Sequence, residues 1–147
     1  SMHNDLPPGS IVVPDDFFSP WDISTLHKND IVHTPPSVDA GLREALLGIV
    51  PEGRGGTYFQ TLGPRFETRS EISFFARDTD VVGMTAASEL TLANELGIPA
   101  AALCTVDNYA NGVGGASAPD YDEIVAISRR NGDRITDIIT KIVEKLA

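Results

Sequence analysis

The chain has 147 residues, of which 41% are hydrophobic, 7% aromatic and 22% charged. This length and composition suit one soluble globular domain, and they exclude a disordered or fibrous chain. The formal net charge is −10. Nucleic acids and anionic membranes are therefore unfavourable partners, because their phosphates repel an acidic surface.

The cysteine count and the lengths of the apolar runs indicate the cellular compartment and the domain organisation to expect. Cys104 is the only cysteine, so no intrachain disulfide can form, and its apolar neighbours predict a small core residue. This fits a reducing compartment, and we expect a cytoplasmic protein without a signal peptide. No apolar run approaches the roughly 18 residues of a membrane-spanning helix. We expect residues 1–147 to form a single domain, with residues 1–6 a tag or a disordered terminus.

The first third of the chain is mostly irregular. Residues 11–13 are a short apolar run that predicts one strand, and Pro14 suits the end or edge of that strand. A helix is expected over 38–50, where apolar residues recur at helical spacing and Ser37 can cap the first turn. The glycine-rich turn 52–56 ends this helix.

The middle of the chain alternates strands and helices. Thr68 and Glu71 form a capping box, in which each side chain can bond the backbone of the other residue. The order strand–helix–strand–helix–strand is typical of an α/β fold with a mainly parallel or mixed sheet flanked by helices. Strands are predicted over 57–62, 80–84 and 100–106, and helices begin at Thr68 and at Ser88.

A glycine-rich loop and a long helix close the chain. The loop covers 111–118, and it lacks the G-x-G-x-x-G spacing of a dinucleotide-binding turn. The last helix should carry one apolar stripe, with two lysines near its C-terminal end, where cations suit the helix dipole. The stripe consists of Ile135, Ile138, Ile139, Ile142, Val143 and Leu146.

Polar and aromatic side chains follow each of the three predicted strands. Ligands of open α/β sheets bind at the C-terminal ends of the strands, so segments 63–68, 83–85 and 107–109 should converge if the strands are parallel neighbours. Together they supply an aromatic face, a carboxylate, a thioether, a hydroxyl and a carboxamide, which suit a flat polar heterocycle attached to a sugar. Structural alternatives are a helix-terminal carboxylate for Glu67, a core filler for Met84 and a turn former for Asn108.

Three stretches of sequence resemble one enzyme family. TYFQTLGPRFETRSEI is similar to the GTYV-x-x-x-GPRFET-x-x-E signature of the trimeric purine nucleoside and methylthioadenosine phosphorylases. The segments DTDVVGMTAASELTLANELG, TVDNYANG and LPPGSIVVPDDFFSP resemble further motifs of that family. The match covers most of 7–112, and its motifs are too long and too well ordered for chance. The resemblance implies a nucleoside phosphorylase-like fold, represented by its C-terminal, base-binding half and lacking the N-terminal half.

The resemblance implies a purine site. Phe66 would stack on the base or ribose, while Glu67 and Asn108 would act as catalytic residues on the purine, Asn108 at its N7 and O6 edge. A carboxylate accepts from the N1–H of a 6-oxopurine, and a carboxamide donates to O6 or N7. This pair therefore favours inosine, guanosine or methylthioinosine over methylthioadenosine. Asp107 stands where the family usually has a small residue, and a second carboxylate there could alter the base preference.

The same resemblance implies contacts with sugar and phosphate. Met84 would pack on the ribose, and Thr85 would touch phosphate. His33 resembles a position that reaches across a subunit boundary toward the 5′ end of the sugar, and a surface-loop histidine is the equal alternative. No metal and no cofactor are implied, and inorganic phosphate is the co-substrate.

The implied reaction is phosphorolysis of a purine nucleoside to the free base and a ribose 1-phosphate derivative, the work of a pentosyltransferase in purine salvage. The family's glycine-rich phosphate loop and Arg-His-Gly segment do not appear in the sequence. We therefore expect weak activity from this chain alone, a possible complementary N-terminal-half chain, and assembly into a homotrimer or hexamer. The alternatives are a methylthioadenosine phosphorylase, a non-catalytic nucleobase-binding or assembly protein, and a hydrolytic nucleosidase.

Overall fold

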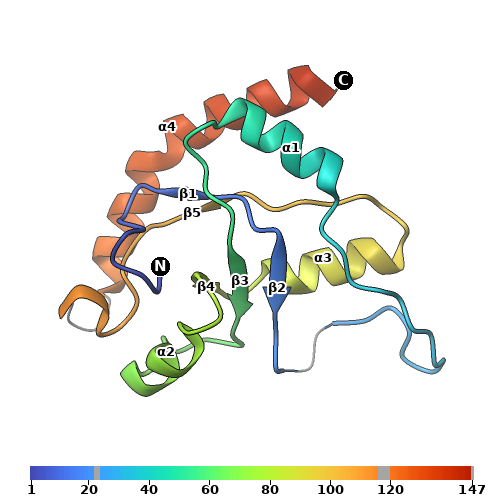
Figure 1. The fold of residues 1–147 in the computed structure, drawn as a ribbon, viewed down its shortest axis with the longest axis horizontal. Helices are drawn as coiled ribbons and strands as arrows, with labels where there is room; N and C mark the ends of the chain where they lie inside the picture. Colours follow the sequence, from blue (N-terminus) through green and yellow to red (C-terminus); the bar gives the residue numbers. More distant parts are fainter. Residues whose placement is uncertain (22–23, 116–119, 147) are drawn as a thin grey trace.

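A computed structural model describes residues 1–21, 24–115 and 120–146 (Figure 1). A short 3-10 turn, Val113–Gly115, precedes the last helix. No helix among the described residues is long and apolar enough to cross a membrane. In chain order the elements are β1 (Ile11–Val12), β2 (Asp16–Phe18), α1 (Ala40–Ile49), β3 (Thr57–Gln60), α2 (Arg69–Phe75), β4 (Val81–Gly83), α3 (Ala86–Glu95), β5 (Cys104–Thr105) and α4 (Tyr121–Leu146).

The strands pair in two sets. β2, β3 and β4 are parallel neighbours in that order, and Tyr58 in β3 lies between Phe17 and Val81. β1 and β5 are antiparallel. A parallel bridge between Val12 and Arg54 connects β1 to the residues just before β3. The predicted α/β class with a mixed sheet and flanking helices is confirmed.

The third predicted strand, 100–106, differs from the expectation. Only Cys104–Thr105 is strand, and it pairs antiparallel with β1 instead of lying parallel to β4. The carbonyl of Ala100 accepts a hydrogen bond from the amide of Asp39 (2.8 Å), so this backbone holds the start of α1. Continuous apolarity predicts that a segment is buried, but it does not choose the partner strand.

Two predicted helix starts are also corrected. α1 begins at Ala40, and the carboxylate of Asp39 caps it by accepting from the amide of Leu42 (2.8 Å). The amide of Ser37 instead donates to the side chain of Asn94 (2.6 Å). α3 begins at Ala86, two residues before Ser88. For α1 a local N-cap two residues past Ser37 fixes the start, whereas for α3 the hydroxyl of Tyr58, from β3, accepts from the first amides.

The capping box before α2 is confirmed. The hydroxyl of Thr68 accepts from the amide of Glu71 (3.2 Å), and the carboxylate of Glu71 accepts from the amide of Thr68 (2.7 Å). Arg65 adds a forked ion pair to the same carboxylate, with its closest contact at 2.7 Å. The two capping bonds and the Arg65 ion pair therefore hold Glu71 in one position.

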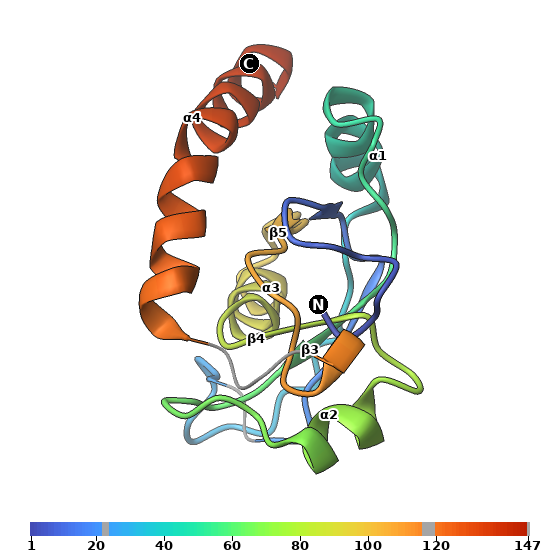
Figure 2. The ribbon, with the colours of Figure 1, turned by 90° about the vertical axis from the view of Figure 1, so that its left-hand side faces the viewer.

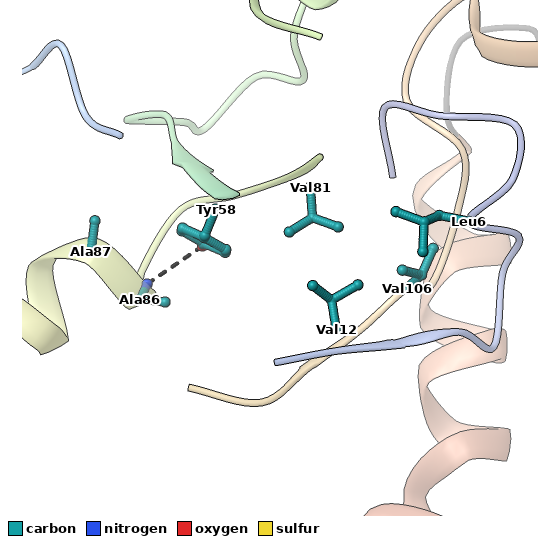
Figure 3. Packing of buried hydrophobic residues seen from close by; sticks show 7 residues of the cluster. All are labelled: Leu6, Val12, Tyr58, Val81, Ala86, Ala87 and Val106. Atoms are coloured by element: carbon teal, nitrogen blue, oxygen red, sulfur yellow. Dashed lines mark hydrogen bonds between the residues drawn. The ribbon is translucent and has the colours of Figure 1, made fainter. Parts of the chain in front are cut away.

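Buried apolar side chains join the strands to the chain start. One cluster packs β3, β4 and α3 against β1 and the segment after β5, and it includes Leu6 (Figure 3). Another packs Met2 against Phe59 and Ile72. Because Met2 and Leu6 are both nearly inaccessible, residues 1–6 are not a disordered terminus. Burial of Met2 and Leu6, which the irregular sequence did not indicate, holds this segment against the core, while Asn4 and Asp5 stay exposed.

α4 stands beside α1 at one end of the molecule (Figure 2). Ile138 is buried against Leu46 and Val50, and Ile142 is partly buried. Ile139 and Val143, by contrast, are 54% and 60% exposed. The buried part of the predicted stripe is therefore narrower than expected, because only the side of α4 that carries Ile138 and Ile142 packs against α1 and β1. The side chain of Leu146 lies outside the described residues.

Candidate functional site

The loop after β3 places Glu67 beside the end of the sheet. The amide of Thr61 donates to the carbonyl of Gly83 (2.9 Å), which extends the pairing of β3 with β4 by one residue. The hydroxyl of Thr61 then donates to Oε1 of Glu67 (2.6 Å). Oε2 of Glu67 accepts no hydrogen bond from any described residue. One carboxylate oxygen is thus fixed by the protein, and the other is available to a ligand.

Met84 lies against the same loop. Gly63 has φ +63, and a Cβ built on it would lie 2.7 Å from the sulfur of Met84. Glycine is favoured there both by the left-handed backbone and by the close sulfur. The turns that follow β3 and β4 therefore touch, as the sequence predicts for two parallel neighbours.

A cavity of about 270 Å³ opens over Glu67. Its walls include three aromatic residues, Trp21, Phe59 and Phe75, and also the Arg65–Glu71 ion pair. The Arg65 guanidinium and the amide of Thr68 lower the pKa of Glu71 to about 2, so this carboxylate is ionised at neutral pH. Small-molecule sites are typically apolar clefts with a few polar groups, starting at about 300 Å³. The cavity lies just below that range.

The segment after β5 approaches Glu67 from the other side. The side-chain amide of Asn111 donates to the carbonyl of Glu67 (3.3 Å). The amino group of Ser1 donates to the carbonyl of Asn108 (2.6 Å). Burial lowers the pKa of that amino group to about 6, while the charges of Asp107 and Glu67 raise it, so both carboxylates lie near one nitrogen.

The side chain of Asn108 is held in place by its neighbour. Its Nδ2 donates to the carbonyl of Tyr109 (2.7 Å). A carboxamide nitrogen carries two hydrogens, so one N–H remains for another acceptor. Asn108 is not among the residues that line the cavity over Glu67. The structure therefore brings its segment to Glu67 without placing the Asn108 side chain in that cavity.

Thr85 begins α3 at a second cavity of about 450 Å³. Its own side chain makes no capping bond and is exposed. Instead, the hydroxyl of Tyr58 accepts from the amides of Thr85 (3.3 Å) and Ala86 (3.4 Å). Cys104 and Glu89 lie on the walls of the same cavity.

Two other candidates lie apart from these groups. Phe66 is 37% exposed and does not line the cavity over Glu67. His33 lies on the surface, in a depression of about 200 Å³ with Asn94 and Glu95. Asn94 and Glu95 are at the C-terminal end of α3, whereas Thr85 is at its N-terminal end. Within one chain the structure does not bring His33 to Glu67.

The sequence reasoning missed three residues that shape the candidate site. Thr61 orients Glu67, Tyr58 holds the start of α3, and Trp21 walls the cavity. Trp21 is the only tryptophan in the chain, and this was the one feature of the sequence that could have indicated it.

Within the described ranges, no group of three or more His, Cys, Asp or Glu side chains could hold a metal ion.

Comparison with protein families gives a match over nearly the whole chain. The family model described as "Phosphorylase superfamily" matches residues 1–144. A "Probable 6-oxopurine nucleoside phosphorylase" of Archaeoglobus fulgidus is 39% identical over 143 residues, which cover 93% of this chain and 58% of the relative. A "Probable S-methyl-5′-thioinosine phosphorylase" of Methanothermobacter thermautotrophicus is 37% identical over 152 residues, covering 99% of this chain and 54% of the relative.

Solved structures with the same fold are more distant in sequence. A Schistosoma purine nucleoside phosphorylase in complex with hypoxanthine superposes with a TM-score of 0.82 at 24% identity, covering 99% of this chain and 59% of that one. Isoform 2 of the Schistosoma mansoni enzyme, in complex with cytosine and ribose-1-phosphate, gives 0.86 at 18% identity, with 99% and 57% covered. These likenesses concern the fold. The chain spans somewhat over half the length of the proteins that it matches.

Proposed function

The chain belongs to the phosphorylase superfamily, and from this premise we propose that it forms the base-binding part of an enzyme that cleaves purine nucleosides with phosphate. The observation that carries the proposal is the position of Glu67. Its carboxylate is fixed by Thr61 in an aromatic cavity, with the segment of Asn108 alongside. The named relatives act, by their names, on 6-oxopurine nucleosides and on methylthioinosine.

In the proposed reaction, the bond between C1′ of the sugar and N9 of the purine breaks, and its electron pair leaves with the purine. A phosphate oxygen forms the new bond to C1′. Negative charge grows on the purine in the transition state, so groups that bind the charged base lower the barrier. The free N–H of Asn108 can donate to N7 or O6, while Oε2 of Glu67 accepts from N1–H.

The donor and acceptor types of Glu67 and Asn108 favour one class of base within this proposal. A 6-oxopurine presents a donor at N1 and an acceptor at O6, which complement Glu67 and Asn108. Adenine presents an amino donor at the six-position instead, which would face the N–H of Asn108. We therefore propose inosine, guanosine or methylthioinosine as substrates. Asp107, the residue before Asn108, would add a second carboxylate that modulates this choice.

Sugar, phosphate and assembly complete the proposal. Met84 would pack on the ribose with Phe66 at the rim, and Thr85 would touch phosphate. The other phosphate contacts would come from the part of the relatives' length that this chain does not span, on the same or a complementary polypeptide. No cofactor is needed. We place the enzyme in cytoplasmic purine salvage as a homo-oligomer, in which His33 could reach the sugar bound by a neighbouring subunit.

A substrate panel tests the proposal. Inosine, guanosine, adenosine and the two methylthio nucleosides should be assayed with and without phosphate in the intact protein. Release of hypoxanthine or guanine only with phosphate, together with a ribose 1-phosphate product, is the expected result. Free ribose as the product would identify a hydrolase. Binding of hypoxanthine without any turnover would identify a non-catalytic nucleobase-binding protein.

The substitution Asn108→Asp tests the base contact itself. A carboxylate accepts from the adenine amino group and no longer donates to O6, so the kcat/KM ratio of inosine to adenosine should fall at least about tenfold. Asn29→Asp makes the same chemical change in the exposed loop before α1 and serves as the control. An unchanged ratio in Asn108→Asp would show that this side chain does not face the base.

A further inference from the structure

The start of α3 is held by a residue of the neighbouring strand. The first amides of a helix have no partner within the helix, and the N-cap side chain usually supplies one. Thr85 occupies the N-cap of α3 but makes no such bond. Tyr58 is only 5% exposed, and its hydroxyl accepts from the amide of Thr85 and from that of Ala86, the second of which Figure 3 shows.

The sheet makes room for this contact. Gly83 is the last residue of β4, and a Cβ built on it would overlap the hydroxyl of Tyr58 and lie 2.9 Å from Cζ. The backbone of Gly83 is ordinary, so the close approach of the ring, and not a special φ angle, calls for glycine. Tyr58 and Gly83 thus form one arrangement that fixes the turn Met84–Thr85.

This arrangement changes what Thr85 can do. A threonine that caps its own helix turns its hydroxyl back toward the helix amides. Because the hydroxyl of Tyr58 accepts from the helix amides instead, the Thr85 side chain stays exposed where it lines the 450 Å³ cavity. The positive end of the helix dipole lies at the same place and favours an anion.

We infer that Tyr58 is a positioning residue for the phosphate co-substrate, acting through the Met84–Thr85 turn. The inference rests on the proposed function, in which Thr85 touches phosphate. The hydroxyl of Tyr58 caps α3 in place of Thr85 and also bonds the Thr85 side chain, so it fixes how that side chain is presented to the incoming phosphate. Tyr58 itself does not contact the purine or the sugar.

The charge state of Tyr58 suits this role. Burial raises its pKa, while the amides of Thr85 and Ala86, and a bond with the Thr85 side chain, lower it. The net shift is upward, so the hydroxyl is neutral at physiological pH and does not repel an arriving phosphate. A phenolate beneath the helix start would repel it.

The substitution Tyr58→Phe keeps the ring and removes the hydroxyl. We expect the KM for phosphate of the intact protein to rise about tenfold, the effect of one to two lost hydrogen bonds. The KM for the nucleoside and kcat at saturating phosphate should stay within about twofold. Gly83→Ala should give the same pattern, because its methyl group would displace the Tyr58 hydroxyl. Tyr121→Phe, on the exposed start of α4, is the matched control.

The possible outcomes separate this inference from the proposed function. If the unaltered protein shows no phosphate-dependent turnover, the proposed function fails. If it is active but Tyr58→Phe leaves the KM for phosphate unchanged, or changes kcat and both KM values alike, the inference alone fails. Should the variant not fold, NMR of the unaltered protein decides: phosphate must shift the amide resonances of Thr85 and Ala86, and unshifted resonances would overturn the inference.

Discussion

Cys104 shows at the scale of one residue how the surroundings set chemical character. The sequence marks it as an apolar core residue, and the structure places it partly buried on a cavity wall. Burial, with a smaller contribution from the charge of Glu89, raises the pKa of its thiol to about 11. Because the thiolate is the reactive form, a thiol with a raised pKa is unreactive at neutral pH even where solvent can reach it.

This gives a labelling prediction. At pH 8 the folded chain should react with iodoacetamide about 100-fold more slowly than the chain unfolded in urea, since two pH units separate a pKa of about 11 from the ordinary 9.0. The folded rate should keep rising as the pH approaches 11. The chain has no other cysteine, so mass spectrometry reads one site. Equal rates in both states would contradict the raised pKa.

Glu67 and Asn108 show which parts of a candidate site the sequence indicates and which it does not. Their types and their spacing indicated a polar site, and the structure brings their segments together through Asn111. It also shows Thr61 on one oxygen of Glu67 and the Tyr109 carbonyl on the amide of Asn108. These supporting contacts decide which hydrogen-bonding atoms of Glu67 and Asn108 remain for a ligand, and no sequence pattern predicts them.

At the scale of elements, α2 is the best example of a helix specified by its own sequence. It is only seven residues long, too short to be stable by propensity alone. The box of Thr68 and Glu71, the Arg65 ion pair and the buried side chain of Ile72 hold it in place. It bears on the proposed function because the residue before its cap is Glu67.

Removing the cap should therefore be measurable. Thr68→Ala loses the bond to the amide of Glu71 and should lower the free energy of unfolding by about 1 kcal/mol. Urea denaturation followed by circular dichroism measures it. Ser73→Ala, on the exposed face of the same helix, should have little effect. A loss as large in Ser73→Ala, where alanine has the higher helix propensity, would show that the loss in Thr68→Ala does not come from the cap.

At the scale of the whole molecule, α4 connects the end of the described chain to its beginning. Arg134 donates to the carbonyl of Gly9 (2.8 Å) and to Glu52 (2.7 Å). Ile138 is 5% exposed in a cluster with β1 and α1, while the adjacent Ile139 is 54% exposed. One side chain, more than the stripe as a whole, fastens this helix.

These two isoleucines make a matched pair. Ile138→Ala should destabilise the fold by about 2–4 kcal/mol, through lost burial and the cavity left behind. Ile139→Ala should cost under about 0.5 kcal/mol, because its side chain is mostly in solvent already. Thermal or urea unfolding of both variants measures the difference. Similar losses would show that α4 packs through both residues, in an arrangement other than this one.

The sequence by itself determined the features that depend on local order: the alternation of strands and helices over 57–96, the capping box at Thr68, and the motifs that resemble nucleoside phosphorylases. These follow from periodicity and from contacts between residues a few positions apart. Only the tertiary structure decided that β5 pairs with β1, that the amide of Asp39 meets Ala100, that Met2 and Leu6 lie in the core, and that Tyr58 caps α3. Each depends on groups distant in the chain, whose meeting is set by packing of the whole fold and not by any local pattern.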